Sequence, residues 1–415
     1  MARLRPGVAA RRARDAATRL ERVRRLHPEA DHHHFAGASL GVTAAVYRRV
    51  GGIEPLAEQE DAAFAQRLAE HRVPVLRASD VRVRTSTRAT GRVAHGLAVD
   101  LAVSAWFAGR RHRAADFSSE DLLGAKGDSS VTVIIPTKEC AATIGAVIRE
   151  AVDPLMGLGL VDELVVVDAG PGDGTAQVAA GAGARVLQQD ELMVELGPAL
   201  GKGDAMWRAL QATGGDVVCF LDGDTADPHP GHLQGLLGPL LHDRTVSLVK
   251  GAFERPLDAG TVKLANEGGR VTELMARPLI NLHQPLLAGF SQPLAGEFAA
   301  RRALLEAVSF PVGYGVEIAV LIDALGLCGL EGLAECHLGS RQNRHQPLRV
   351  LGEMAYAVLA AVENRLPERA GRAGPGRYVR PWEDGAVAAI AVQERPPIRA
   401  RDADSESQRL PTPVR

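Results

Sequence analysis

Between Val131 and about Asn364 the sequence alternates short Val- and Ile-rich runs with longer stretches of helical periodicity. A parallel pair of strands needs a long crossover connection, usually a helix, and these helices then cover the sheet. Alternating strand and helix patterns are therefore typical of a mostly parallel sheet. We expect this region to form one α/β domain, with helices on both faces of such a sheet.

Polar residues follow three of the expected strands. Strands are expected at 131–135, 163–167, 185–187 and 216–221, and helices at 141–152, 172–181 and 202–213. The polar groups are Pro136–Glu139, Asp168 and Asp222–Asp224. Ligands of open α/β sheets bind at the carboxyl ends of the strands. The pattern therefore predicts that these three groups, far apart in sequence, meet on one rim.

The sequence Asp222-Gly223-Asp224 is the sharpest of these signals. Two carboxylates one residue apart suit a hard divalent cation, and the glycine between them lets the backbone come close. Such a cation would neutralise a diphosphate leaving group. Taken alone, the pattern is common in turns. Its place after the fourth strand of a βα series favours the metal site.

Two further residues have alternative interpretations. Lys202, between Gly201 and Gly203, stands where a helix is expected to begin and where exposed N–H groups favour anions. The surrounding sequence lacks the full ATP-binding P-loop pattern, and a solvated lysine is the alternative. Asp168 would accept hydrogen bonds from a nucleotide base or ribose, or would cap the next turn.

Charge and composition limit the classes of partner. The chain has 415 residues, with 48 Lys and Arg against 50 Asp and Glu, and a formal net charge of −2. This balance gives no strong field for nucleic acid. The sequence shows no apolar run long enough for a transmembrane segment and no secretion signal, so we expect a cytoplasmic protein. Its four cysteines form no CxxC pair, and reduced thiols are expected.

Composition also divides the chain into three parts. Residues 1–126 are rich in Arg, Ala and His, show a basic helical pattern within 1–25, and end in a charged stretch at 110–130 that we interpret as a linker. Residues 127–365 hold the α/β pattern. Residues 366–415 are rich in Pro and Arg, and a disordered tail is expected there.

Ordered motifs within 131–361 resemble one known family. They are Ile135-Pro-Thr, Val161-Asp-Glu-Leu-Val-Val-Val-Asp168, Gly201-Lys-Gly-Asp-Ala-Met-Trp-Arg208, Phe220-Leu-Asp-Gly-Asp224, Pro228-His-Pro230, Leu248-Val-Lys250, Gly268-Gly-Arg-Val-Thr-Glu-Leu274, Ala276-Arg-Pro-Leu279, Gln292-Pro-Leu294, Gly296-Glu297, Gly313-Tyr-Gly-Val-Glu-Ile318 and Leu338-Gly339. With these motifs the region resembles the glucosyl-3-phosphoglycerate synthases, which are retaining glycosyltransferases. The resemblance implies a GT-A (nucleotide-diphospho-sugar transferase) fold with a Rossmann-like sheet.

The same resemblance implies a hexosyltransferase that moves glucose from UDP-glucose to 3-phosphoglycerate with Mg²⁺ or Mn²⁺ as cofactor, and it leaves room for a homodimer. The implied donor-binding residues are Pro136, Thr137, Glu139, Asp168, Lys202, Asp222 and Gly223. The implied acceptor-binding residues are Gly269, Arg270, Thr272, Arg341 and His345. Glu317 and Asp224 are the implied catalytic residues, and Asp222, Asp224, Asn343 and His345 the implied metal ligands.

Chemistry supports the acceptor assignment, because an acceptor with about three negative charges needs forked cationic donors, which arginine supplies. For Arg270 the alternative is a surface ion pair with Glu267 or Glu273. For Glu317 it is an exposed helical position, but the preceding Gly-Tyr-Gly favours a tight loop that aims the carboxylate inward.

Two positions depart from the family pattern. Asn343 stands where the family has a metal-binding histidine, and His345 where an acceptor-binding asparagine is usual. Either His345 reaches the metal or the ion loses a ligand, and an asparagine oxygen still suits a hard ion. Cys140 replaces a glutamate that contacts the base, and Glu139 is the residue that would compensate.

Residues 32–95 show a second resemblance, to the acceptor-side half of inverting GT-A glycosyltransferases. It rests on the runs 33–42, 47–52 and 58–61. In that family an acid at the Glu60-Asp61 position deprotonates the acceptor. No Asp-x-Asp donor half precedes this segment, so we interpret residues 1–126 as a partial, non-catalytic segment. Glu60 and Asp61 are then carboxylates at a helix start, and His32, His33 and His34 are structural.

Two rival functions remain open at this stage. A nucleotidyltransferase that makes sugar nucleotides would use a related sheet, but no Gly-rich loop with trailing Arg and Lys follows Ile135. The other rival is a catalytically impaired member in which Asn343 and Cys140 have spoiled the site, leaving a protein that binds sugar nucleotides. A transferase with a different sugar or acceptor is also compatible with the residues.

Overall fold

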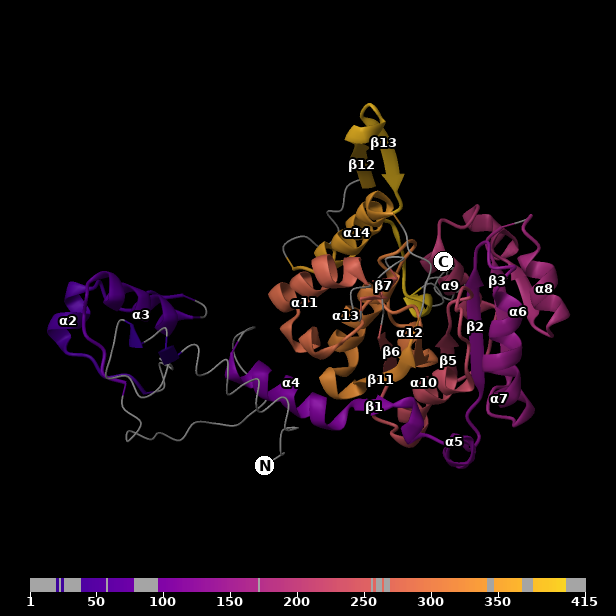
Figure 1. Ribbon diagram of the computed structural model, residues 1–415, viewed down its shortest axis with the longest axis horizontal. Helices are drawn as coiled ribbons and strands as arrows, with labels where there is room; N and C mark the ends of the chain where they lie inside the picture. Colours follow the sequence, from indigo (N-terminus) through magenta and orange to yellow (C-terminus); the bar gives the residue numbers. More distant parts are fainter. Residues whose placement is uncertain are drawn as a thin grey trace, which may run out of the picture. The chain divides into compact units, whose positions relative to one another are not determined.

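The structure is a computed structural model in which contacts group the chain into an N-terminal unit, Met1–Ala108, and a C-terminal unit, Gly109–Arg415 (Figure 1). The residues that the structure describes are 20–21, 24–25, 39–56, 59–77, 96–170, 172–254, 257–258, 263–264, 269–341, 347–367 and 376–400.

The C-terminal unit is built on an eight-stranded sheet of order β1-β11-β6-β9-β5-β2-β3-β4. Its strands are β1 (Arg111–Arg113), β2 (Val131–Thr137), β3 (Glu163–Asp168), β4 (Arg185–Gln188), β5 (Val217–Phe220), β6 (Leu248–Glu254), β9 (Phe298–Arg301) and β11 (Leu333–Ser340). Every pairing is parallel except the two made by β9, which runs antiparallel to β5 and to β6. The predicted mostly parallel α/β sheet is confirmed.

Helices cover this sheet on both faces. The helices of this unit include α5 (Ser119–Lys126), α6 (Ile144–Ala146), η3 (Val147–Val152), α7 (Asp153–Gly157), α8 (Thr175–Gly181), α9 (Lys202–Gln211), α10 (Pro230–His242), η6 (Thr272–Ala276), α11 (Arg277–His283), α12 (Arg302–Leu305), α13 (Val316–Cys328) and α14 (Leu348–Glu363). The predicted helices at 172–181 and 202–213 differ from these bounds by a few residues, and the one at 141–152 is split into α6 and η3.

Side-chain alternation in the strands explains the two covered faces. Val131, Val133 and Ile135 of β2 belong to one apolar cluster together with leucines of α10 and residues of η3. The intervening Ile134 is equally buried but lies outside that cluster, because successive side chains of a strand point to opposite faces. Helix α9 contacts β2, yet none of its buried residues belongs to the cluster, so α9 covers the opposite face.

The expected linker at 110–130 is part of this unit, so the predicted boundary at residue 126 is wrong. Strand β1 pairs with β11, and Leu122 of α5 is fully buried in the main core. The charges that suggested a linker are paired: Arg110 lies 2.5 Å from Asp243, and Arg111 lies 3.0 Å from Glu335. Composition alone does not show such long-range partners, and the boundary falls at Ala108–Gly109.

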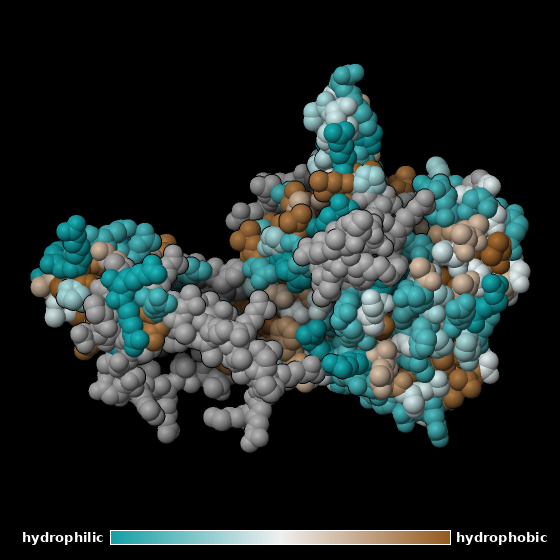
Figure 2. Space-filling model, viewed as in Figure 1, coloured by the Kyte–Doolittle hydropathy of each residue, from teal (hydrophilic) through white to brown (hydrophobic). Residues whose placement is uncertain are grey.

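The disordered tail expected at 366–415 is also wrong over residues 376–400. Strands β12 (Gly376–Arg380) and β13 (Ala386–Ile390) form a hairpin, and β14 (Glu394–Arg395) pairs with β10 (Phe310–Pro311). The tip of this hairpin is mostly hydrophilic (Figure 2). Tertiary pairing orders a composition that resembles a flexible tail, and residues 401–415 lie outside the described part of the chain.

The N-terminal unit contains helices α2 (Ala44–Arg49), α3 (Glu60–Glu70) and α4 (Leu97–Gly109), the last of which ends just past its boundary. Val50, Phe64, Leu68 and Val73 form its small apolar cluster. Glu60 and Asp61 stand in the first turn of α3, where acidic side chains favour the helix dipole.

The resemblance of residues 32–95 to an inverting glycosyltransferase half remains a prediction. His32, His33 and His34 lie outside the described residues, as does most of the basic pattern within 1–25. Across the described ranges, no helix combines the length and the apolar character that crossing a bilayer requires.

Candidate active site

The carboxyl ends of β2 and β3 bring two predicted donor-binding residues together. Thr137 stands opposite Asp168 in the register of the two strands, and its hydroxyl donates a hydrogen bond of 3.2 Å to Asp168 Oδ1. Asp168 is 1% exposed, and its Oδ2 is buried without a hydrogen-bond partner in the described part of the chain. A buried acceptor of this kind suits a donor from a ligand such as a ribose or a base.

Asp222 and Asp224 follow β5 in a turn that needs glycine between them. The Gly223 carbonyl accepts a hydrogen bond of 2.7 Å from the Thr143 hydroxyl. A Cβ on Gly223 would lie 2.7 Å from the methyl group of Thr137, so the turn packs directly on the end of β2. The glycine thus lets the acidic pair lie against the neighbouring strand.

The two aspartates differ in surroundings. The Asp222 side chain is 20% exposed and is held by an ion pair with Lys202, whereas that of Asp224 is 52% exposed. Burial of part of its carboxyl group and the neighbouring charge of Asp222 raise the pKa of Asp224. A carboxylate in this state gains from a nearby cation.

Lys202 is the first residue of α9, and its ammonium lies between two carboxylates. Its Nζ is 2.7 Å from Asp222 Oδ1 and 3.0 Å from Glu317 Oε1. Burial lowers the pKa of Lys202, but the charges of Asp222 and Glu317 outweigh it and raise the pKa above its usual value. Lys202 is therefore a fixed positive charge and not a solvated lysine.

Glycine at position 296 makes room for this ion pair. It directly precedes Glu297 and β9, and a Cβ there would overlap both carboxylate oxygens of Asp222 and the ammonium of Lys202. The antiparallel strand β9, set between β5 and β6, delivers this residue to the rim. The motif Gly296-Glu297 is visible in the sequence, but no role could be assigned to it there.

Glu317 stands near the start of α13 and is buried. Its side chain is 7% exposed, which rules out the exposed helical position considered above. A Cβ on Gly315 would lie 2.6 Å from the side chain of Ala361, so the Gly-Tyr-Gly turn packs closely on α14. This close approach of the turn aims Glu317 inward, at Lys202.

Arg341 follows β11 and is 2% exposed. Its guanidinium forms an ion pair with Glu297 and lies 3.6 Å from Asp222 and 3.8 Å from Asp224. It also donates a hydrogen bond of 2.6 Å to the Thr225 hydroxyl. The sequence predicted that Arg341 binds the acceptor. The structure places its guanidinium beside the acidic pair Asp222 and Asp224. Glu297 is a site residue that sequence reasoning missed.

The other predicted acceptor-binding residues form a second group at the start of η6. Gly269 has φ of 74°, which favours glycine, and Thr272 is buried. Of the two surface partners considered for Arg270, Glu273 lies 2.7 Å from Arg277, and Glu267 lies outside the described residues. Asn343 and His345 lie outside the described residues.

The position of Cys140 matches its apolar character. It is buried, its amide donates a hydrogen bond of 2.9 Å to the Thr175 hydroxyl, and burial raises the pKa of its thiol to about 11. Glu139, the residue proposed to compensate, is exposed and has φ of 56°, in the left-handed region. Its role in base recognition remains a prediction.

The charges of the site fit a divalent cation. Asp222, Asp224, Glu297 and Glu317 supply four carboxylates against the cations Lys202 and Arg341, a formal sum of 2 − 4 = −2. In the described part of the chain no group of three His, Cys, Asp or Glu side chains is arranged to hold a metal. A cation at Asp222 and Asp224 would therefore complete its shell with water and substrate phosphate, as Mg²⁺ commonly does.

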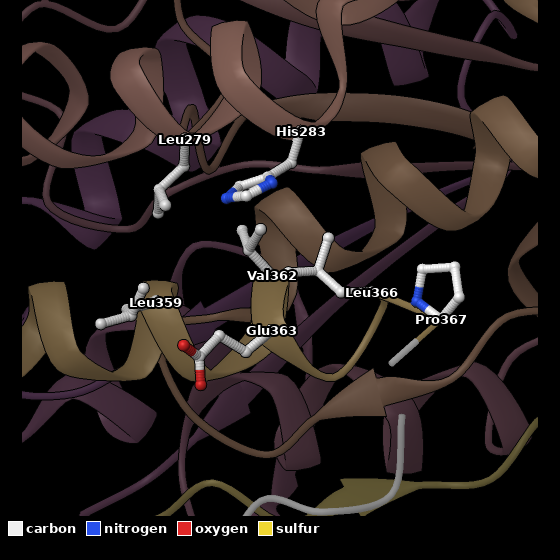
Figure 3. A pocket seen from close by; sticks show the side chains of 7 residues that line it. All are labelled: Leu279, His283, Leu359, Val362, Glu363, Leu366 and Pro367. Atoms are coloured by element: carbon white, nitrogen blue, oxygen red, sulfur yellow. The ribbon is translucent and has the colours of Figure 1, made fainter. Parts of the chain in front are cut away.

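A separate cavity lies between α11 and α14 (Figure 3). It has a volume of about 430 Å³, and its lining includes Leu279 and His283 of α11 and Leu359, Val362 and Glu363 of α14. None of the predicted site residues lines it. The cavity is mostly apolar, so it is distinct from the charged group at the strand ends.

Acidic residues beyond β5 of a mostly parallel sheet, paired with a half-buried lysine, are typical of a glycosyltransferase of the GT-A class, and residues 132–285 match the family model Glycosyl transferase family 2. A glucosyl-3-phosphoglycerate synthase from Mycolicibacterium smegmatis is 40% identical over 295 residues, covering 71% of this chain and 97% of that protein. The chain belongs to the glucosyl-3-phosphoglycerate synthase family.

Other relatives agree. A glucosyl-3-phosphoglycerate synthase from Mycobacterium tuberculosis is 44% identical over 248 residues, covering 59% of this chain and 76% of that protein. A crystal structure of the M. tuberculosis synthase with Mn²⁺, UDP-glucose and phosphoglyceric acid has a TM-score of 0.62 at 37% identity, covering 69% of this chain and 95% of that one. A mannosyl-3-phosphoglycerate synthase from Rubrobacter xylanophilus has a TM-score of 0.64 at 42% identity, covering 72% and 98%.

Proposed function

We propose that this chain transfers glucose from UDP-glucose to 3-phosphoglycerate with retention of configuration, forming glucosyl-3-phosphoglycerate. The observation that carries the proposal is the 40% identity over 97% of the M. smegmatis synthase. The ion pairs of Lys202 with Asp222 and Glu317 support it, because they bring the expected metal and donor residue Asp222 close to the expected catalytic residue Glu317. Relatives have been crystallised with Mn²⁺, UDP and the product glucosyl-3-phosphoglycerate.

The residues of the chain divide the work between donor and acceptor. A bound Mg²⁺ or Mn²⁺ supplies charge neutralisation for the diphosphate leaving group. Asp222 and Asp224 are the ligands for it among the described residues, and Lys202 adds a fixed positive charge beside them. Asp168 and Thr137 bind the nucleoside through the buried acceptor described above.

Acceptor binding falls to Arg270, Thr272 and Arg341. Their guanidinium and hydroxyl groups hold the phosphate and carboxylate of 3-phosphoglycerate through charge-assisted hydrogen bonds. Glu317 faces the donor sugar and the acceptor hydroxyl, and its ion pair with Lys202 fixes its orientation. Holding the leaving oxygen and the acceptor hydroxyl on the same face of the sugar lowers the barrier by orientation.

The test is a screen of donors against acceptors with the purified full chain and Mn²⁺ or Mg²⁺. We expect UDP release that depends on UDP-glucose, on 3-phosphoglycerate and on the metal, and a product whose anomeric proton keeps the donor configuration in NMR spectra. The likeness to the Rubrobacter xylanophilus mannosyl-3-phosphoglycerate synthase makes mannose the second candidate sugar. A preference for GDP-mannose in the same screen would reject glucose.

We also propose a cytoplasmic location and a catalytic part that spans the C-terminal unit alone. Cys140, Cys219, Cys328 and Cys336 are free thiols. Free thiols are typical of a reducing compartment. Whether the enzyme is a homodimer is tested by light scattering of the purified chain, where a mass near twice 43.9 kDa would establish the dimer.

A further inference from the structure

Strand β14 is only two residues long, yet its two side chains reach two different helices. Arg395 pairs with Asp204 of α9, and Glu394 pairs with Arg365, which follows α14. β14 itself pairs with β10, whose last residue, Pro311, lies five positions before the start of α13 at Val316. β14 therefore contacts α9, which carries Lys202, directly, and is linked to α13, which carries Glu317, through the ion pairs of Arg365.

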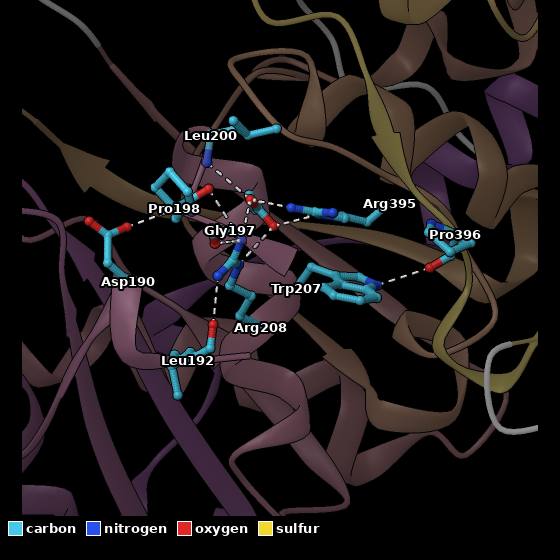
Figure 4. A network of polar contacts seen from close by, with 11 residues as sticks. Asp190, Leu192, Gly197, Pro198, Leu200, Trp207, Arg208, Arg395 and Pro396 are labelled. Atoms are coloured by element: carbon cyan, nitrogen blue, oxygen red, sulfur yellow. Dashed lines mark hydrogen bonds and ion pairs between the residues drawn. The ribbon is translucent and has the colours of Figure 1, made fainter. Parts of the chain in front are cut away.

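The contact with α9 is a buried network (Figure 4). Arg395 donates two hydrogen bonds to Asp204, of 2.8 Å from Nε and 2.9 Å from the terminal nitrogen. Asp204 is fully buried and also accepts hydrogen bonds from Arg208 and from the Leu200 amide. Burial alone would raise the pKa of Asp204, but the hydrogen bonds from Arg395 and Arg208 lower it. The carboxylate thus stays charged.

Asp204 lies in the first turn of α9, two residues after Lys202. Its amide donates a hydrogen bond of 3.1 Å to the Val312 carbonyl, and the Val312 amide donates one of 3.0 Å to the Gln393 carbonyl. A Cβ on Gly203 would overlap the carbonyl oxygen of Pro311. The start of α9, β10 and β14 therefore form a closed ring of contacts, and Arg395 closes it.

The second contact runs toward α13. Arg365 donates hydrogen bonds of 2.7 Å to Asp323 of α13 and of 2.9 Å to Glu394. Burial lowers the pKa of Arg365, but Asp323 and Glu394 outweigh it and keep the guanidinium charged. The helix that carries Glu317 and the helix that carries Lys202 are thereby tied to the same short strand.

We propose that Arg395 is a positioning residue for the donor site: by holding Asp204 it fixes the first turn of α9, and with it the Lys202 ammonium opposite Asp222 and Glu317. This inference rests on the proposed function, because the ligand of Lys202 is the diphosphate of the donor. Removing Arg395 leaves Asp204 paired with Arg208, so we expect the fold to survive while the start of α9 loses its bond to β14.

The test measures binding of UDP with Mn²⁺, and separately of 3-phosphoglycerate, to the full chain by calorimetry. For R395A we expect the UDP affinity to fall on the order of tenfold, because small displacements of a positioned charge are costly. The affinity for 3-phosphoglycerate stays within about twofold, since its proposed binding residues Arg270, Thr272 and Arg341 stand on neither α9 nor β14. R395K restores part of the UDP affinity. The matched control is R399A, four residues further along and 56% exposed, which leaves both affinities unchanged.

The outcomes separate the two proposals. Wild-type chain that does not bind UDP with Mn²⁺ contradicts the proposed function. If the wild type binds UDP and R395A binds it equally well, or if R395A loses both ligands alike, Arg395 is not a positioning residue for the donor. Should R395A fail to fold, R395K decides: a folded variant with a donor-selective loss supports the inference, and wild-type donor affinity overturns it.

Discussion

Lys202 shows how a single residue gains its role from its neighbours. Its ammonium is one of two cations among four carboxylates, and the excess of negative charge is concentrated at Asp222 and Asp224. A solvated lysine on the surface has no fixed partners, and its ammonium has no fixed position. Here the ion pairs on both sides, and the absence of a side chain at Gly296, give it one position. The role of each site residue follows from this charge arrangement.

The first prediction concerns the half-exposed acid of the pair. Asp224→Ala removes a cation ligand from a site whose charge sum favours a divalent ion, so Mn²⁺-dependent UDP binding and turnover should fall by at least on the order of 100-fold. Calorimetry and a UDP-release assay measure both. The matched control is Asp227→Ala, an exposed acid in the same loop, which should leave them unchanged. Full turnover by the Asp224 variant would reject the metal assignment.

The second prediction is that one substitution raises the affinity for Mn²⁺ and lowers the affinity for UDP. Lys202→Ala changes the formal charge of the site from −2 to −3, counted over the same four carboxylates and Arg341. Mn²⁺ alone should then bind more tightly, whereas UDP should bind more weakly, because the ammonium no longer faces the diphosphate. Separate titrations of metal and of nucleotide distinguish this result from general loss of folding, which would weaken both.

The third prediction concerns acid stability. Burial, with the nearby charges of Arg341 and His229, lowers the pKa of His232 to about 4 from 6.5. The unfolded chain then binds a proton before the folded one does, so the free energy of unfolding decreases as the pH falls from 6.5 toward 4. His232→Gln should remove a few kcal/mol of this dependence. Urea titrations at several pH values measure it, and an unaltered pH profile would contradict the assignment.

At the scale of elements, the sequence predicts what local periodicity encodes. The ends of β2, β3 and β5 are visible as apolar runs that stop at Pro136, Asp168 and Asp222, and parallel strands place such ends on one rim. Strand β9 is different, because its antiparallel place between β5 and β6 depends on pairings far apart in sequence. The sequence alone therefore could not show that Glu297, next to β9, belongs to the site.

The order of residues 376–400, within the expected tail, could not be predicted from local sequence either. A segment rich in Pro and Arg has the composition of a disordered chain, but residues 376–400 have partners elsewhere in the sequence, among them Asp204 for Arg395 and Arg365 for Glu394. Long-range ion pairs leave no local pattern. Sequence reasoning could therefore find Lys202 and the acidic pair, but not the contacts of β14 that support them.

The fourth prediction tests the packing of α9 on β10. Gly203→Ala places a methyl group against the Pro311 carbonyl and should lower the free energy of unfolding by roughly 1–3 kcal/mol. The matched control is Gly326→Ala, at an exposed position of helix α13 with open space around it, which should raise that free energy by about 0.5–1 kcal/mol. Chemical denaturation of both variants decides, and equal effects would contradict the close approach.

At the scale of the whole molecule, the two units differ in content. The C-terminal unit carries every described residue of the candidate site, and the N-terminal unit has its own small apolar cluster. Glu60 and Asp61, which a glycosyltransferase half would use as a base, have the place of acids at a helix start.

The fifth prediction follows from this division. Replacing Glu60 and Asp61 together by alanine in the full chain should change the rate of glucosyl transfer less than about twofold, because neither residue belongs to the C-terminal unit. The steady-state rates of the double variant and the wild type provide the measurement. A large loss of transfer would show that the N-terminal unit takes part in the reaction.

Strand order also has a consequence for synthesis. β5 and β6 do not pair with each other, and β9 is the strand that joins them. A nascent chain on the ribosome that has reached residue 290 therefore holds the half-sheet β5-β2-β3-β4, whose β5 edge is open, and β6 as a single strand without its neighbours β9 and β11. Strand β1 remains unpaired for longer, since its partner β11 ends at Ser340. Chaperones that shield exposed edges should bind the chain through most of its translation, and release it only when the last third has emerged.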